Sequence, residues 1–101
     1  MNRTPESGDI RTKLNQETSR IAWKDLQTFY ARGHIVRVAA ELDLLTVASE
    51  LAADNAAQLR QWMDAGQVGE VTISDAQRYF EENRELWAVV LMPWVLIQDK
   101  P

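Results

Sequence analysis

The sequence contains no cysteine, and this absence excludes disulfide bonds, cysteine metal sites and thiol catalysis together. It has a single histidine, His34, so the paired histidines of a HExxH zinc site cannot form. Its few glycines match neither a dinucleotide-binding pattern nor a P-loop, and no serine lies in a G-x-S-x-G elbow. No motif in the chain implies a cofactor or a bound metal.

The sequence also lacks a long hydrophobic run. A membrane-spanning helix needs about 20 apolar residues, and the longest apolar run here, residues 86–97, holds only 12. The N-terminus has no apolar core of the kind found in signal peptides. We therefore expect residues 1–8 to form a disordered tail, residues 9–98 to form one domain, and the protein to be cytoplasmic, with no membrane partner.

The apolar run near the C-terminus is the most informative segment of the chain. Its β-branched and aromatic residues favour a strand, and its apolar side chains on both faces predict a strand that is covered on both sides. One straight strand of this length would span about 40 Å, which exceeds the about 34 Å diameter expected for a domain of this size. The run is therefore expected to bend or break at Pro93.

The remaining pattern predicts an α+β fold. A long N-terminal helix over residues 9–32 ends at Gly33, and residues 34–38 alternate as a short strand. Short helices follow over 44–53, capped by Asp43, and over 54–65, capped by Asp54 and closed by Gly66. The second of these is expected to bury Ala56, Leu59, Trp62 and Met63.

A last helix is predicted from the capping sequence that begins at Ser74 to about Arg84, with Ala76, Tyr79 and Phe80 turned inward. We expect the long helix and two or three short helices to pack on a small sheet. That sheet includes the C-terminal apolar strand or strands.

Charge is distributed unevenly along the chain. Residues 1–40 carry seven Lys/Arg and four Asp/Glu, a net charge of +3, whereas residues 41–101 carry four Lys/Arg and eleven Asp/Glu, a net charge of −7. An acidic surface of this kind is either simply solvated or takes part in electrostatic docking.

Aromatic side chains suggest where a partner would bind. Trp23 and Tyr30 share one stripe of the predicted first helix, and they either pack within the domain or form a partner-binding face. Trp87, Leu91 and Trp94 in the C-terminal run complete the predicted interface. We interpret the chain as a non-enzymatic protein-binding or adaptor domain whose partner is another protein or a second copy. A homodimer through paired C-terminal strands would protect an apolar edge.

Two alternative functions remain open at this point. Residues 44–71 resemble a helix-turn-helix with a short wing, although the would-be recognition helix carries Arg60 and Asp64, and the acidic surroundings disfavour nucleic acid. A small metal-dependent enzyme would use Glu41, Asp43 and His34, because carboxylates two residues apart on a strand point the same way.

Several short motifs in a fixed order resemble a known family. They are Ile21-Ala22-Trp23-Lys24-Asp25-Leu26, Gly33, Glu41-Leu42-Asp43-Leu44, Trp62, Gly66, Ala88-Val89-Val90 and Pro93-Trp94-Val95-Leu96-Ile97-Gln98. Together they resemble an uncharacterised bacterial family, domain of unknown function 2288, over about residues 9–98. The resemblance implies a small cytoplasmic bacterial protein and transfers no activity, cofactor or catalytic residue.

Overall fold

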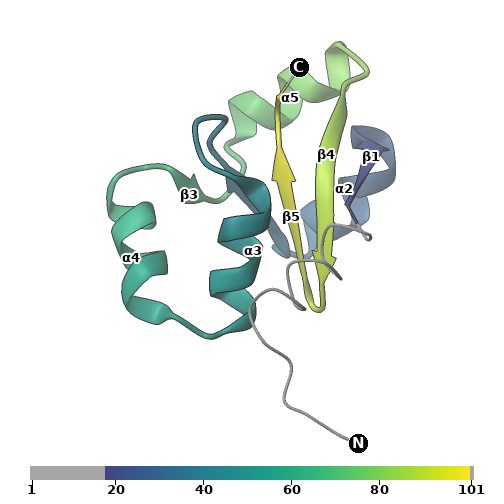
Figure 1. Ribbon diagram of the computed structural model, residues 1–101. Helices are drawn as coiled ribbons and strands as arrows, with labels where there is room; N and C mark the ends of the chain where they lie inside the picture. The colour runs from purple at the N-terminus through teal and green to yellow at the C-terminus, as the bar shows by residue number, and fades with distance from the viewer. Residues whose placement is uncertain (1–17, 101) are drawn as a thin grey trace, which may run out of the picture.

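A five-stranded mixed sheet forms the centre of the computed structural model, which describes residues 18–100 (Figure 1). The strands lie in the order β1-β4-β5-β2-β3, and only β2 and β5 are parallel. The elements are β1 (Ser19–Ala22), α2 (Trp23–Ala31), β2 (Ile35–Val38), α3 (Leu44–Ala52), α4 (Ala56–Asp64), β3 (Val68–Gly69), α5 (Ile73–Glu81), β4 (Glu85–Leu91) and β5 (Trp94–Gln98). The predicted α+β class is confirmed.

The C-terminal apolar run forms two strands joined by a tight turn. Leu91 at the end of β4 is opposite Trp94 at the start of β5, and Met92 and Pro93, joined by a cis peptide bond, make the turn between them. The predicted break at Pro93 is confirmed. Both strands are interior strands of the sheet. Strand β4 lies between β1 and β5, and strand β5 lies between β4 and β2. A homodimer through the edges of these strands is therefore a wrong prediction.

The sheet is covered on both faces, as its apolar pattern predicts. Along β5, Val95 and Ile97 join one core cluster, and Leu96 between them joins the other. Strand β2 splits in the same way, because Ile35 belongs to the first cluster and Val38 to the second. Side chains alternate between the two faces of a strand, so one apolar run supplies both cores.

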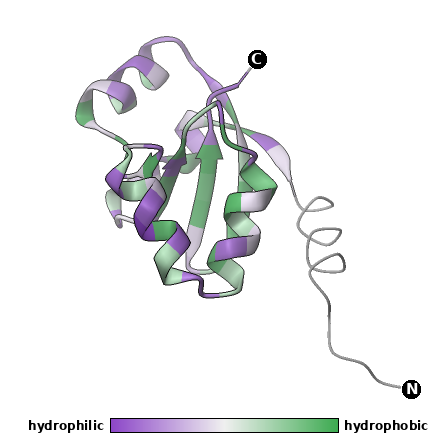
Figure 2. Cartoon of the chain, turned by 60° about the vertical axis from the view of Figure 1, so that its left-hand side comes forward, coloured by the Kyte–Doolittle hydropathy of each residue, from purple (hydrophilic) through white to green (hydrophobic). Residues whose placement is uncertain are grey.

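Helices α2 and α5 pack on one face of the sheet, and α3 packs on the other, with α4 beside α3 near β3 (Figure 1). Figure 2 shows that the strands behind α3 and α4 are among the most hydrophobic parts of the chain. No helix formed by residues 18–100 has the length and apolar character needed to cross a membrane.

The long N-terminal helix is the main error of the sequence-based prediction. Residues 19–22 form β1, and the helix begins only at Trp23. The Trp23 N–H donates to the carbonyl oxygen of Arg84, so main-chain bonding to the β4 side continues up to the first helical residue. Pairing of these residues with β4 gives hydrogen-bond partners to the main-chain groups along one edge of β4. This gain outweighs the helical spacing of the apolar side chains in the segment. The predicted helix over residues 9–17 and the predicted tail over 1–8 lie outside the described residues.

The helix ends agree with the sequence in part. Gly33 and Gly66 both adopt a φ of +75°, as predicted for residues that follow a helix C-terminus. Helix α4, however, is capped by Asn55, whose side chain accepts from the Gln58 N–H, and not by Asp54.

The start of α5 is also shifted from its predicted position. Thr72 caps the helix by accepting from the Asp75 N–H at 3.0 Å, two residues before the predicted cap at Ser74. Phe80 is 63% exposed, so its predicted inward orientation is wrong, whereas Tyr79 is buried as predicted.

Helix α4 is less buried than its pattern predicts. Ala56 and Met63 are exposed, Leu59 and Trp62 are only half-buried, and no residue of α4 is fully buried. The helix packs against α3 and β3 and not directly on the centre of the sheet. This position leaves apolar side chains of α3, α4 and the sheet facing one another across open space.

Candidate functional site

The candidate site is an apolar groove of about 560 Å³ between the α3–α4 hairpin and the sheet. We name it the α3–α4 groove. Most of its wall is apolar and is formed by Val47, Leu51, Leu59, Met63, Trp94 and Leu96. Ligand sites in proteins are commonly concave, mostly apolar and of about 300–1,000 Å³, so the groove has the size and lining of a binding site.

The turn between α3 and α4 sets the shape of the groove. Asp54 adopts a φ of +59°, and the next residue, Asn55, caps α4 and donates from its side-chain amide to Glu50 Oε1 at 2.7 Å. After α4, the Gln67 N–H donates to the carbonyl oxygen of Trp62 at 2.8 Å, which directs the chain into β3. Helix α4 is thus held at both ends, so its apolar side faces the sheet across the groove.

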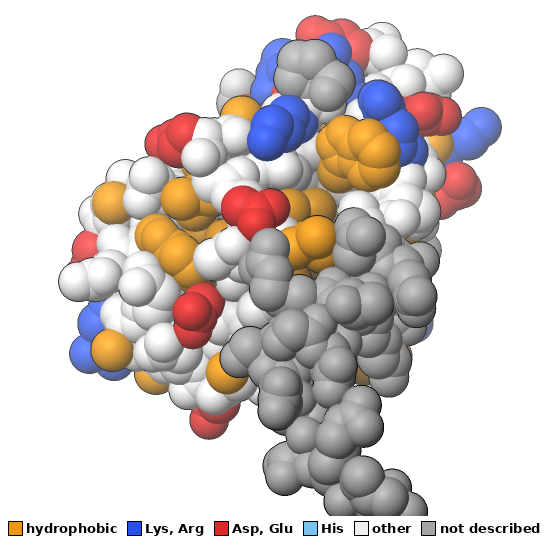
Figure 3. Space-filling model, in the orientation of Figure 1, with side chains coloured by type: hydrophobic (Ala, Val, Ile, Leu, Met, Phe, Trp, Pro, Cys, Tyr) orange, Lys and Arg blue, Asp and Glu red, His pale blue; other side chains and the backbone are white. Residues whose placement is uncertain are grey.

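Two large apolar side chains stand exposed at the groove. Met63 of α4 is 58% exposed and Trp94 of β5 is 38% exposed. The His34 ring lies edge-on to Trp94, with ring centroids 5.9 Å apart. Glu70 is the charged residue of the lining. Figure 3 shows hydrophobic side chains gathered on this face, with acidic side chains beside them.

The five predicted interface residues do not form one surface. Trp23 is 2% exposed, and its ring centroid lies 5.3 Å from that of Tyr30 and 5.3 Å from that of Tyr79. Trp23 is therefore part of the core between the sheet and helices α2 and α5, and the half-buried Tyr30 packs against the same core.

The other three predicted residues lie on the α3 side of the sheet. Trp87 and Leu91 are half-buried on β4, and the Arg20 guanidinium lies 5.3 Å from the Trp87 ring centroid. Trp94 is the only one of the five that lines the α3–α4 groove. Met63, Leu51 and Leu59 line it as well, and the sequence did not single them out as site residues because their spacing is that of an ordinary buried helix face.

The predicted metal or acid–base site is not assembled. His34 precedes β2, whereas Glu41 and Asp43 follow it, so the strand separates the histidine from the carboxylates. Glu41 accepts from Gln67 Nε2 at 3.2 Å, and Asp43 accepts from the Thr46 hydroxyl at 2.7 Å. Within residues 18–100 no three His, Asp or Glu side chains gather in a way that could hold a metal ion.

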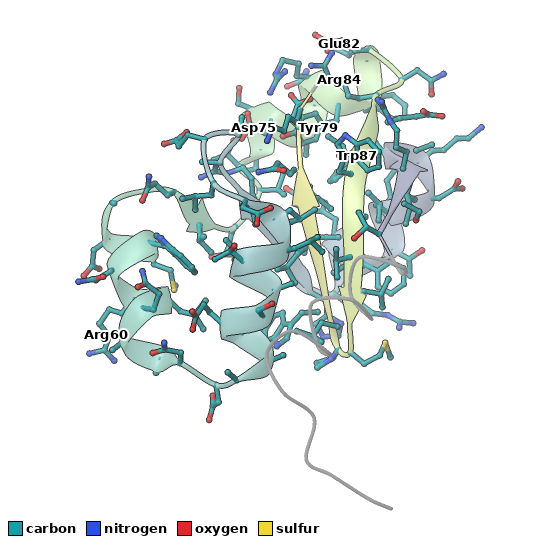
Figure 4. The ribbon with its side chains drawn as sticks, viewed as in Figure 1. Arg60, Asp75, Tyr79, Glu82, Arg84 and Trp87 are labelled. Atoms are coloured by element: carbon teal, nitrogen blue, oxygen red, sulfur yellow. The ribbon has the colours of Figure 1, made fainter. Side chains whose placement is uncertain are left out.

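A second site, which is polar, lies away from the groove, at the carboxyl ends of β2 and β5. This cavity of about 170 Å³ is lined chiefly by Arg37, Asp75, Arg78, Tyr79 and Asp99, and we name it the β2–β5 cleft. Figure 4 shows Asp75 and Tyr79 at this end of β5 and Arg60 far away on α4. Sequence reasoning missed the cleft, because its residues come from separate segments with no shared motif.

Burial governs the chemistry of the tyrosine in this cleft. Loss of solvation raises the pKa of Tyr79, and the carboxylates of Asp75 and Asp99 raise it further, while the guanidinium groups of Arg78 and Arg37 act in the opposite direction. The hydroxyl of Tyr79 therefore stays protonated at neutral pH and is available as a hydrogen-bond donor.

Comparison with known proteins supports the family resemblance seen in the sequence. The family described as "Protein of unknown function (DUF2288)" matches residues 9–99. An NMR solution structure of the protein PA1075 from Pseudomonas aeruginosa is similar, with 39% sequence identity and a TM-score of 0.78 over 97% of this chain and 91% of that chain. No functionally curated protein matches.

Proposed function

The chain belongs to the DUF2288 family of proteins of unknown function, and we propose that it is a non-enzymatic binding domain whose α3–α4 groove takes the apolar face of a basic amphipathic helix. The partner is a protein that presents this helix. The observation that carries the proposal is an apolar groove whose α3, α4 and β3 side belongs to a strongly acidic segment of the chain.

The apolar part of the proposal rests on Met63 and Trp94. Methionine adapts its shape to different apolar partners and is common at such surfaces, and tryptophan is enriched among the residues that contribute most to binding. Both stand exposed at the groove although they are large and apolar. An amphipathic helix would cover them with residues spaced three and four positions apart.

The charge of the partner follows from the charge of the segment that forms one side of the groove. Residues 41–70, which form α3, α4 and β3, carry six acidic residues and one basic residue, a net charge of −5. A helix with lysine or arginine beside its apolar face would therefore be attracted, and an acidic one repelled. The same charge disfavours the alternative of nucleic-acid binding through α4, which offers Arg60 as its basic residue.

The proposal is tested by titration calorimetry with designed helical peptides. One peptide places leucines on one face and lysines on the other, and a second replaces every lysine by glutamate. We expect saturable binding of the lysine peptide and none of the glutamate peptide. Substitution Met63→Gln should weaken binding about fivefold or more, which corresponds to about 1 kcal/mol.

The matched control is Phe80→Gln, because Phe80 is 63% exposed, close to the 58% of Met63, but lies on α5 against the opposite face of the sheet. Equal effects of the two substitutions would refute the groove as the binding surface. Concentration-dependent dimerisation that Met63→Gln abolishes would instead identify a second copy of the chain as the occupant, and would overturn the choice of a basic helix.

A further inference from the structure

The β2–β5 cleft lies where polar ligands bind in many sheets with parallel strands. Strands β2 and β5 run parallel, with Val38 beside Gln98 at their carboxyl ends. Ligands favour the crevice outside the carboxyl ends of parallel strands. The cavity of about 170 Å³ opens at this place and is separate from the α3–α4 groove. It has room for about five water molecules at about 30 Å³ each, or for one small polar ligand.

The acidic side chains of the cleft are already neutralised by arginines. Asp99 accepts two hydrogen bonds from Arg84, from Nε at 3.1 Å and from Nη2 at 3.2 Å. Arg78 lies between Asp75 and Asp99, with nitrogen–oxygen distances of 3.5 Å to each. These pairs compensate part of the negative charge of the walls, and Arg37 adds a further positive charge to the lining.

Arg37, by contrast, has no acidic partner among residues 18–100. Its Nη2 donates to the carbonyl oxygen of Gly66 at 3.3 Å. Its Nε–H is buried and donates to no acceptor in the described part of the chain. The side chain of Arg37 also lines the cleft, so it is the cationic group there that keeps donors for an acceptor other than a carboxylate of the protein.

Tyr79 supplies the second donor. Its side chain lines the cleft although the residue is only 2% exposed. The Arg78 guanidinium lies over its ring, 5.0 Å from the ring centroid. The phenol of Tyr79 and the guanidinium of Arg37 thus supply hydrogen-bond donors from two different elements to the walls of one small cavity.

We propose that the β2–β5 cleft binds a small oxyanion, a carboxylate or a phosphate, through the guanidinium of Arg37 and the hydroxyl of Tyr79. Guanidinium groups match the planar pairs of oxygen atoms that carboxylates and phosphates present. The small volume limits the ligand to a free small acid or to the anionic end of a longer molecule. This proposal is independent of the function proposed for the α3–α4 groove.

The test is an NMR titration of the full chain with inorganic phosphate and, separately, with acetate, at constant ionic strength maintained by sodium chloride. We expect saturable shifts of the Arg37 Nε–H signal and of the amide signals of Ala39 and Ala40, which also line the cleft. Saturation by only one of the two anions identifies which chemistry the cleft accepts. No saturable shift with either anion up to about 100 mM would overturn the proposal, since one good charge-assisted hydrogen bond supports binding in this range.

Variants separate specific binding from a general salt effect. Tyr79→Phe keeps the ring and removes the hydroxyl, so it should weaken anion binding about tenfold, and Arg37→Met should abolish it. Arg60→Met is the control, because Arg60 is an exposed arginine distant from the cleft (Figure 4). Equal anion affinity of Tyr79→Phe and Arg60→Met would overturn the proposal, even in the case that Arg37→Met does not fold.

Discussion

The side-chain amide of Gln98 donates to the main-chain carbonyl oxygen of Leu42 over 2.7 Å, and this bond fastens the loop before α3 to the last residue of β5. The same nitrogen donates to the carbonyl oxygen of Ala39 at 2.8 Å, which also accepts from the Leu42 N–H. Gln98 is 3% exposed, so these bonds lie away from water. They fix where α3 begins, and α3 forms one wall of the α3–α4 groove.

Replacement of Gln98 by methionine should therefore destabilise the fold. The substitution keeps the approximate volume but leaves the Leu42 carbonyl without this donor, which costs about 1–3 kcal/mol for a buried acceptor. Urea unfolding followed by circular dichroism measures the difference. Gln77→Met on the exposed side of α5 is the control and should change stability by less than about 0.5 kcal/mol. Equal midpoints for the two variants would show that the Gln98 bonds contribute nothing.

Two glycine-to-alanine substitutions should distinguish the free-energy cost of an unfavourable backbone conformation from that of a steric clash. Gly33 has a φ of +75°, and a Cβ added there meets no atom within 4 Å. Gly33→Ala should cost about 1 kcal/mol because an L-residue disfavours this conformation, not because of a clash. A Cβ at Gly69 also meets open space, and that residue has no positive φ, so Gly69→Ala should be neutral or slightly stabilising. Thermal unfolding of both variants checks the contrast; two equally destabilised proteins would contradict it.

The break between β4 and β5 and the ends of two helices could be predicted because the physical constraints on them act locally. Twelve apolar residues cannot form one straight strand across so small a domain, and Pro93 is the residue that interrupts them. Gly33 and Gly66 end helices because glycine reaches positive φ without strain. These features depend on chain geometry and on single residue types, so no knowledge of tertiary partners was needed.

The errors arise where a distant segment decides the local structure. Residues 19–22 have helical spacing, yet they pair with Glu85–Ala88, more than 60 positions later in the chain. The observed cap of α5, Thr72, lies two residues before the predicted cap, Ser74, because both residue types are able to cap a helix. Local propensity cannot choose between such options, and tertiary packing does.

The candidate site was only partly visible in the sequence. Trp94 could be singled out because a large aromatic residue beside a proline turn is conspicuous. Met63 was expected in the core, since apolar spacing does not reveal that α4 packs against α3 and β3 and not on the centre of the sheet. Arg37 and Tyr79 lie 42 positions apart, and only the fold brings them to one cleft.

The proposed helix partner implies a specific salt dependence. Binding of the lysine peptide should weaken as sodium chloride rises from about 0.05 to 0.5 M, because salt screens the attraction between the lysines and the acidic residues of segment 41–70. A peptide with glutamine in place of every lysine retains the apolar face and should show little change over the same range. Calorimetry at several salt concentrations measures both. A lysine peptide whose affinity does not depend on salt would show that charge plays no part in the recognition.

The stability of the folded protein should fall at alkaline pH because Tyr79 is buried. Loss of solvation and the facing carboxylates of Asp75 and Asp99 raise the pKa of this hydroxyl in the folded protein, against the opposing effect of Arg37 and Arg78. As pH rises past about 10, the tyrosine of the unfolded chain loses its proton while the folded protein still holds it, so unfolding is favoured. The contribution of the protonated Tyr79 hydroxyl to the free energy of unfolding is fully present below the pKa of this group in the unfolded chain. It is lost as pH rises through the higher pKa of the group in the folded protein.

Denaturant unfolding of the wild type and of Tyr79→Phe between pH 8 and about 11.5 tests this linkage. Wild-type stability should fall more steeply than that of Tyr79→Phe above about pH 10, because the variant has no proton to release at this position. Tyr30→Phe is the matched control: it removes the other of the two tyrosine hydroxyls and leaves Tyr79 in place, so it should keep the steep fall. Parallel curves for wild type and Tyr79→Phe would show that the buried hydroxyl does not resist ionisation, and would remove the reason to regard it as a neutral donor in the β2–β5 cleft.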